Sequence, residues 1–326
     1  MKIVFNTRQP DAAASLFYQE ALQDMEEVSC YDQNFSAYDI ALFMTYDYGV
    51  VRQVKEAHPS IKIGIIDPRS TPVLSATPYC DFLVVDGVEM EDFWRIAEKP
   101  IFKYAEYPRF LINQKSKTEK QNKDKTYIGY HGNPLHIMEG AKTLTPALTE
   151  LGEKYDIELL LMVNTHAIGS ELEDRYLGSL PSNVKITHAP WHMDNYNNFL
   201  ARSDIGIVPN NLGCTPVRTL AIGDPKTDYC LSFKMTSNPG RIIVFGLMGI
   251  PVIADFYPSA LQYLQNETGF VAHSKAGWKY CLEQLIKNKK LRETMGQKLK
   301  TLVEDKFNFD HQNKQFRIFL ASLLEQ

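Results

Sequence analysis

At 326 residues the chain exceeds the roughly 250–300 residues that one hydrophobic core usually serves, so we expect two domains. The net charge of −4 argues against a nucleic-acid-binding protein, which needs a broad cationic face. The five scattered cysteines contain no Cys-x-x-Cys pair, which favours a reducing compartment. The start has too short an apolar run for a signal peptide, and no stretch is long enough to span a membrane, so we expect a cytoplasmic location.

Short apolar runs alternate with helical patterns along the first part of the chain. The predicted strands and helices are Lys2–Phe5, Asp11–Met25 (helix), Ile40–Met44, Val50–Ala57 (helix), Ile61–Ile66, Phe82–Val85 and Glu89–Ala97 (helix). This alternation predicts an α/β domain over residues 1–113 with a mostly parallel sheet. Ligands bind at the carboxyl ends of such strands, so the loop Asp67–Ser70 and its neighbours form the candidate acceptor side.

A polar segment separates this domain from the next. Residues 114–125 contain five lysines and no apolar residue, and we predict a linker over 114–126. An alternative interpretation is a basic patch that contacts anionic lipid at the inner membrane face, since Tyr104, Tyr107 and Phe110 lie just upstream.

A second alternation predicts another α/β domain over residues 127–309, so the fold class is α/β with two Rossmann-like domains facing a cleft. Its predicted elements are Tyr127–Tyr130, Ile137–Leu151 (helix), Ile157–Val163, Val184–Thr187, Asp194–Ala201 (helix), Ile205–Val208, Thr268–Val271, Trp278–Lys287 (helix) and Leu291–Glu304 (helix). A last amphipathic helix, residues 310–326, is expected to pack back on the first domain.

The stretch Phe233–Asp255 carries the strongest local signals in the chain. Asn238-Pro239 predicts a helix start, Gly249 a helix end, and Pro-Val-Ile-Ala a buried parallel strand. Lys234, Ser237, Asn238 and Arg241 would therefore gather at a helix N-terminus. Backbone N–H groups, the positive end of the helix dipole and two cations make this a predicted anion site.

Several common chemistries have no motif in the sequence. Neither a dinucleotide fingerprint nor a P-loop is present, and no Asp-x-Asp pair offers a simple metal site. His188 and His192 are four residues apart, but Pro190 and Trp191 between them favour a strand end over a shared helical face. We therefore expect no bound metal and no cofactor.

The second domain contains a series of short motifs at Ser203–Pro209, Phe245–Ala254, Asn266–Val271, Lys289–Gly296 and Phe307–Phe309. In sequence and in order, these motifs resemble those of glycosyltransferases with the GT-B fold, in particular the family-four group. The resemblance covers roughly Tyr127–Phe309, while the first domain is similar only in its strand pattern.

The resemblance implies a nucleotide-sugar donor held mainly by the second domain, with the acceptor in the cleft. Lys234, Ser237 and Asn238 stand where the family binds the pyrophosphate, and the turn His131-Gly132-Asn133 matches its first loop, where a glycine lets the backbone approach phosphate. Arg218, Lys226 or Arg241 would supply a second cation. Asp67 would be a general base, although a turn explains Asp-Pro-Arg equally well.

One departure concerns two glutamates, eight residues apart, that many retaining members of the family carry. Thr236 and Val244 stand in their places here. The expected function is that of a metal-independent glycosyltransferase, which moves a sugar from a nucleotide-sugar donor to a glycan or lipid-linked acceptor. A nucleotide-sugar epimerase on the same fold and a catalytically silent nucleotide-sugar-binding subunit are the alternatives.

Overall fold

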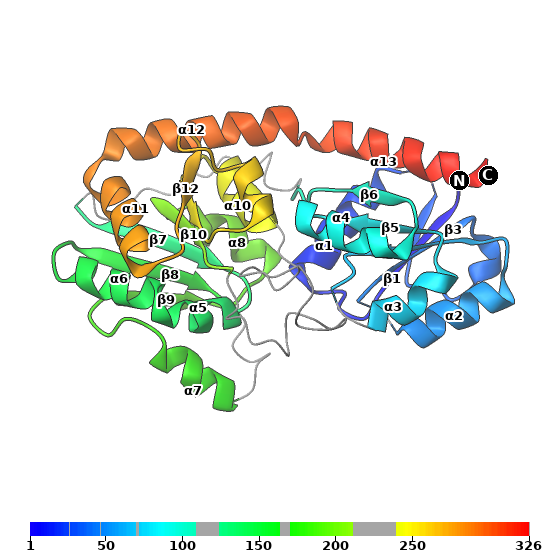
Figure 1. Cartoon of the computed structure of the whole chain (residues 1–326), viewed down its shortest axis with the longest axis horizontal. Helices are drawn as coiled ribbons and strands as arrows, with labels where there is room; N and C mark the ends of the chain where they lie inside the picture. The colour runs from blue at the N-terminus through cyan, green and yellow to red at the C-terminus, as the bar shows by residue number, and fades with distance from the viewer. Residues whose placement is uncertain are drawn as a thin grey trace.

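The structure is a computed structural model that describes residues 1–25, 27–45, 47–69, 72–108, 124–163, 170–210 and 239–325. Within these ranges the chain forms two halves, each built on a parallel sheet of six strands (Figure 1). We call residues 1–108 the N-terminal half and residues 124–306 the C-terminal half. The predicted α/β fold class with two Rossmann-like units is confirmed.

In the N-terminal sheet, the first strand of the chain, β1, lies next to an edge strand. From edge to edge its strands are β2 (Val28–Cys30), β1 (Ile3–Thr7), β3 (Ile40–Met44), β4 (Lys62–Ile66), β5 (Phe82–Val85) and β6 (Ile101–Lys103). The helices of this half are α1 (Ala13–Gln23), α2 (Tyr48–Ala57), α3 (Pro72–Ala76) and α4 (Val88–Trp94), with short 3-10 turns at Phe35–Ala37, Thr77–Tyr79 and Arg95–Ala97. Every residue of β3 is buried, which is why that strand reads as an unbroken apolar run.

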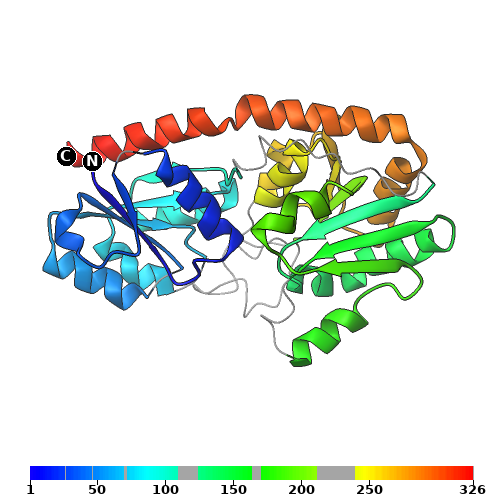
Figure 2. The same ribbon diagram turned by 180° about the vertical axis from the view of Figure 1, so that it is seen from behind.

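The C-terminal sheet follows the same plan. Its strands, from edge to edge, are β12 (Gly269–Val271), β11 (Val252–Ala254), β10 (Ile205–Val208), β7 (Thr126–His131), β8 (Ile157–Met162) and β9 (Lys185–Ala189). The helices are α5 (Leu135–Glu139), α6 (Leu144–Gly152), α7 (Ser170–Gly178), α8 (Met193–Leu200), α10 (Gly240–Leu247), α11 (Lys275–Lys287) and α12 (Lys289–Lys306), with 3-10 turns at Gly140–Lys142 (η5) and Pro258–Gln262 (η7). Figure 2 shows this half from behind, with its sheet toward the viewer.

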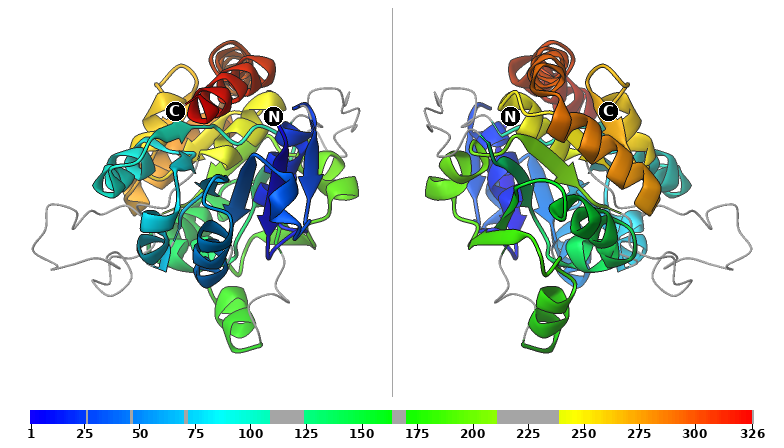
Figure 3. Two further views of the ribbon diagram at one scale, coloured as in Figure 1. Left: turned by 90° about the vertical axis from the view of Figure 1, so that its right-hand side faces the viewer. Right: turned by 90° about the vertical axis from the view of Figure 1, so that its left-hand side faces the viewer.

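One prediction about helices in the C-terminal half is wrong, and one helix was not predicted. The single helix expected over Ile137–Leu151 is interrupted by η5, and α6 starts afresh at Leu144. This restart places Pro146 in the first turn of a helix, where its missing N–H group costs no hydrogen bond. Helix α7 has no counterpart among the predicted elements, and it stands away from the body of the molecule in both views of Figure 3.

The predicted helix and strand in the stretch Phe233–Asp255 are confirmed as α10 and β11, although α10 begins at Gly240 with Pro239 as its N-cap. Gly249 ends the helix in the left-handed region, with φ +70°, and Ile250 donates its N–H to the carbonyl of Phe245 at 3.0 Å. Helix α12 then crosses close to α10, because Gly246 leaves room for Leu299 and Val303.

The last two helices run along one side of both halves (Figures 1 and 2). Helix α12 belongs to the C-terminal half, and α13 (Phe309–Leu324) lies against the N-terminal half. There Phe316 stacks on Phe102 of β6 with ring centroids 4.9 Å apart, and Asn313 accepts a hydrogen bond from the Tyr104 hydroxyl at 2.6 Å and donates one to the carbonyl of Ala21 at 3.0 Å.

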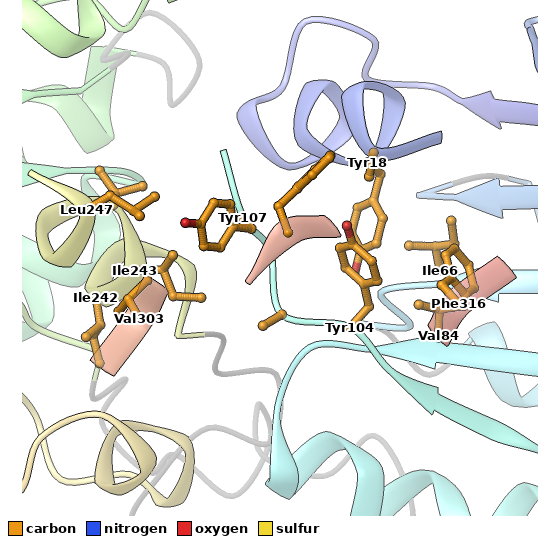
Figure 4. Close-up of a cluster of buried hydrophobic side chains, with 14 of the residues drawn as sticks. Tyr18, Ile66, Val84, Tyr104, Tyr107, Ile242, Ile243, Leu247, Val303 and Phe316 are labelled. Atoms are coloured by element: carbon orange, nitrogen blue, oxygen red, sulfur yellow. The ribbon is translucent and has the colours of Figure 1, made fainter. Parts of the chain in front are cut away.

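One apolar cluster continues from one half into the other (Figure 4). Tyr107, which follows β6, is packed between the N-terminal core around Tyr18 and Tyr104 and the C-terminal core around Leu247. The ring of Tyr107 also meets that of Phe309 at the start of α13, with centroids 6.1 Å apart. Among the helices of the described ranges, none has both the length and the apolar character needed to cross a bilayer.

Candidate active site

A cavity of about 200 Å³ lies between the two halves. Its N-terminal wall is formed by the start of α1 together with Arg69 and Glu106, and its C-terminal wall by the turn after β7 with Asn210 and Arg241. These residues follow the carboxyl ends of β1, β4, β6, β7 and β10. Open parallel sheets bind their ligands at this edge, so the cavity is the candidate site.

The turn after β7 brings main chain close to the cavity. Gly132 has a φ of +128°, which L side chains rarely adopt, and a Cβ there would lie 3.3 Å from both Arg241 Cδ and the Tyr130 hydroxyl. Asn133 accepts a hydrogen bond from the N–H of Leu135 at 2.9 Å and so supports the start of α5. The carbonyl of Asn133 in turn accepts a hydrogen bond from the Tyr130 hydroxyl at 2.6 Å.

Arg241 reaches from the first turn of α10 across to this turn. Its guanidinium donates to Asn210 Oδ1 at 2.7 Å, to the carbonyl of Pro209 at 3.2 Å and to the Tyr130 hydroxyl at 3.3 Å. The guanidinium also lies 5.7 Å from the centroid of the Tyr130 ring, within cation–π range. These contacts hold a permanent positive charge at the wall of the cavity, near the positive end of the α10 dipole.

His131 is buried beside this charge. Tyr196 and Phe245 pack edge-on against the imidazole, and the Tyr196 hydroxyl lies 3.2 Å from Nδ1. Burial, reinforced by the charge of Arg241, lowers the pKa of His131 to about 3. The ring is therefore neutral near pH 7 and does not add to the positive charge of the site.

Three carboxylates meet on the N-terminal side, at the ends of neighbouring strands. Asp67, Asp86 and Glu106 offer oxygen atoms that all lie within 4.8 Å of one another. The Arg69 guanidinium is paired with all three, at 2.5 Å to Asp67 and at 3.6 Å to both Asp86 and Glu106. Burial acts to lower the pKa of Arg69, but the three negative charges outweigh it and raise that pKa above its usual range.

This carboxylate cluster has the oxygen-rich composition of a divalent-metal site, but the positive charge within it belongs to a side chain. Asp67 adopts a left-handed conformation, with φ 50°, and its side chain is buried under the ion pair to Arg69. Within the described part of the chain, Arg69 and Glu106 line the cavity and Asp67 does not. The role of Asp67 as a general base stays a prediction.

The structure brings together half of the site residues expected from the sequence. His131, Gly132, Asn133 and Arg241 all line the cavity. Lys234, Ser237 and Asn238 lie outside the described residues, as do the alternative cations Arg218 and Lys226.

Sequence reasoning included Arg69 in a candidate acceptor-side loop without giving it a role, and it missed Glu106 and Asn210. Arg69 and Asn210 stand in loops directly after predicted strands, and that position was the available signal. Glu106 follows β6, a strand of three partly exposed residues with no recognisable pattern.

Two parallel Rossmann-like units with a cavity at the carboxyl ends of their strands define the GT-B architecture. Comparison with solved structures finds the same arrangement over the whole chain. HepE of Anabaena, solved in complex with UDP, is 12% identical with a TM-score of 0.69, covering 99% of this chain and 100% of its own.

Two further solved structures are similar over their full length. Sucrose-phosphate synthase of Thermosynechococcus elongatus is 11% identical with a TM-score of 0.66, covering 100% of both chains. A glycosyltransferase of Rickettsia africae is 10% identical with a TM-score of 0.69, covering 100% of this chain and 99% of its own. No protein-family model and no curated protein sequence matches the chain. At such low identity these likenesses establish the fold.

Proposed function

We propose that the protein is a glycosyltransferase that moves a sugar from a nucleoside-diphosphate donor to a hydroxyl group of a glycan or lipid-linked acceptor. The observation that carries the proposal is the cavity shared by both halves, with a fixed arginine and a close-approaching glycine turn on one wall and the Arg69–carboxylate cluster on the other. The likeness to glycosyltransferases of the same fold supports it.

The C-terminal wall suits the donor. A nucleoside diphosphate leaves with increased negative charge, which Arg241 and the start of α10 would stabilise at the moment of bond cleavage. The open backbone of Gly132 permits a phosphate to approach closely. Lys234 is the second cation we expect there. Two side-chain charges would be sufficient for this task, so we infer that the reaction needs no metal ion.

The N-terminal wall suits the acceptor. Glu106 is a carboxylate at the cavity that can accept a hydrogen bond from an acceptor hydroxyl, while Arg69 restrains its position. Enclosure between two halves would also keep out water, which competes with the acceptor for the activated sugar.

A catalytically silent subunit is the second candidate, and one observation favours it. Val244, which stands where many retaining relatives carry a glutamate, is fully buried in the apolar cluster between α10 and its neighbours. A valine there has no polar atom that could contact a donor hydroxyl. The donor sugar must therefore be held in another way, or transfer does not occur.

The deciding experiment combines calorimetry and product analysis. UDP is titrated first because HepE was solved with it, and GDP second. Purified protein is then incubated with nucleotide-sugars, alone and with a panel of acceptors. Transfer of sugar to an acceptor establishes the proposal. Binding without turnover identifies the silent subunit, an isomerised donor without acceptor identifies an epimerase, and the absence of any nucleotide binding overturns the proposal.

Arg241→Ala is the matched test of the donor wall. Loss of a charge-assisted contact predicts nucleotide affinity lower by about 10- to 150-fold. Arg52→Ala, which removes an exposed arginine paired with Glu56 on α2, is the control and should leave affinity unchanged.

A further inference from the structure

Asn210 occupies an unusual position in the cavity wall. It follows β10 and is only 2% exposed, and its backbone N–H is bound to Asp255 Oδ2 at 2.7 Å. Its side-chain oxygen accepts the hydrogen bond from Arg241 at 2.7 Å. The amide of Asn210 is therefore fixed at both the main chain and the side chain.

The bond from Arg241 determines which way the amide is turned. A guanidinium only donates hydrogen bonds, so the group of Asn210 that faces it must be the carbonyl oxygen. The amide nitrogen then points away from Arg241 with two N–H groups. This nitrogen is buried and has no hydrogen-bond partner among the described residues.

A buried donor without a partner is costly, because its hydration is lost and nothing replaces it. Few such groups occur in folded proteins, and a bound ligand is one way to supply the missing acceptor. Asn210 lines the cavity beside Arg241, so an acceptor placed there would meet a positive charge and amide hydrogens together. That combination fits an oxyanion and does not fit a cation or an apolar group.

We infer that Asn210 is a phosphate-binding residue, whose amide N–H groups donate to an oxygen of the diphosphate of the donor nucleotide while its carbonyl oxygen holds Arg241 in place. The inference rests on the proposed function for the identity of the ligand. It assigns to the residue after β10 a direct contact with the ligand, in addition to the support it gives to Arg241.

Removing the Asn210 side chain with and without Arg241 separates the two roles. Asn210→Ala is compared in the wild-type background and in an Arg241→Ala background. If Asn210 only supports Arg241, Asn210→Ala has no further effect on nucleotide affinity once the arginine is gone. If Asn210 binds phosphate, Asn210→Ala lowers the affinity for UDP by about 10- to 150-fold in the wild-type background and lowers it again in the Arg241→Ala background.

Calorimetry on the full chain, with uridine, UDP and inorganic pyrophosphate as probes, tests the inference. We expect Asn210→Ala to weaken UDP and pyrophosphate in both backgrounds and to leave any binding of uridine unchanged. Asn183→Ala, which removes the side chain of an exposed asparagine, is the control. Unchanged UDP affinity on adding Asn210→Ala to Arg241→Ala, or an equal loss for uridine, overturns the inference.

The same titrations keep this inference apart from the proposed function. If the wild type binds pyrophosphate through Asn210 but binds no nucleotide, the phosphate site stands and the glycosyltransferase proposal fails. If nucleotide binds and supports transfer while Asn210→Ala has no effect in the Arg241→Ala background, the proposed function stands and the inference fails. Absence of binding to all three probes overturns both.

Discussion

Glu89 of α4 and Ser259 of η7 are hydrogen-bonded to each other across the two halves. Ser259 donates its N–H to Glu89 Oε2 at 3.1 Å, its hydroxyl contacts the same oxygen, and that hydroxyl accepts the N–H of Val88 at 3.0 Å. Both residues are buried, and within the described chain the other carboxylate oxygen of Glu89 has no hydrogen-bond partner. The contact fixes the start of α4 to the C-terminal half.

Burial raises the pKa of Glu89 above its usual range, against the hydrogen bonds from Ser259 that lower it. The folded protein therefore holds a proton at pH values where the unfolded chain has released it. The contribution of Glu89 to the free energy of unfolding falls as pH rises through the raised folded pKa. Glu89→Gln should remove this dependence and be at least as stable at pH 8, while Ser259→Ala should lose about 1–3 kcal/mol. Urea titrations from pH 5 to 8 would check both, and a Glu89→Gln protein that unfolds more readily at pH 8 would contradict the first.

His131 predicts a pH dependence of the opposite sign. The folded pKa of about 3 lies below that of an unfolded histidine, near 6.5, so the unfolded chain takes up a proton first as pH falls. The free energy of unfolding should decrease between pH 6.5 and 4, by up to about 1.4 kcal/mol per pH unit from this residue. In His131→Gln the slope should be smaller, measured by denaturant titration. His311→Gln, at an exposed position of α13, is the matched control variant.

Gly132→Ala should damage binding more than folding. The new Cβ would lie at a φ of +128° and 3.3 Å from Arg241 Cδ, so either the turn or the arginine must move, at about 1–3 kcal/mol. We expect weaker UDP binding by calorimetry with a modest fall in melting temperature. Gly178→Ala in α7, where the added Cβ meets nothing within 4 Å, is the matched control. Equal UDP affinities in the two variants would show that this turn is not part of the UDP-binding site.

Metal chelation should leave transfer activity intact. Arg241, with Lys234, is expected to supply the positive charge for the leaving diphosphate, and Arg69 already pairs with the three carboxylates that otherwise suit a divalent cation. Activity is to be measured before and after EDTA treatment and dialysis. Complete loss on EDTA, restored by Mg²⁺ or Mn²⁺ alone, would contradict the metal-independent reaction and direct attention to Asp67, Asp86 and Glu106.

Phe316→Ala should destabilise the whole molecule. The ring is fully buried on β6, and removing such a side chain costs about 3–5 kcal/mol. Ile318 lies two residues away and is 54% exposed, so Ile318→Ala should change the melting temperature little. Similar melting temperatures for the two variants would show that α13 does not contribute to stability through this contact.

The parts of the fold that could be predicted carry strong local signals. Pro239 and Gly249 mark the two ends of α10, and the run Ile40–Met44 is wholly apolar because β3 is covered on both faces. Strands β2 and β6 are only three residues long and partly exposed, so they have no distinctive pattern. Long and fully buried strands and helices are therefore easier to recognise from a single sequence than short, partly exposed ones.

Site residues could be predicted from the sequence only where they lie together in one short segment. His131, Gly132 and Asn133 form a turn that the sequence displays, and Arg241 begins a recognisable helix. Arg69, Glu106 and Asn210 become site residues through the packing of strands that are distant in sequence. Their roles depend on partners, such as Arg241 for Asn210, that no local pattern reveals.

The place of α13 has a consequence for synthesis on the ribosome. Phe102 is synthesised well before Phe316, the ring that covers it. During translation an apolar face of the nascent N-terminal half therefore stays exposed to solvent until α13 has been synthesised. We expect that face to be a binding site for chaperones, and the docking of α13 on the N-terminal half to be a late step of folding.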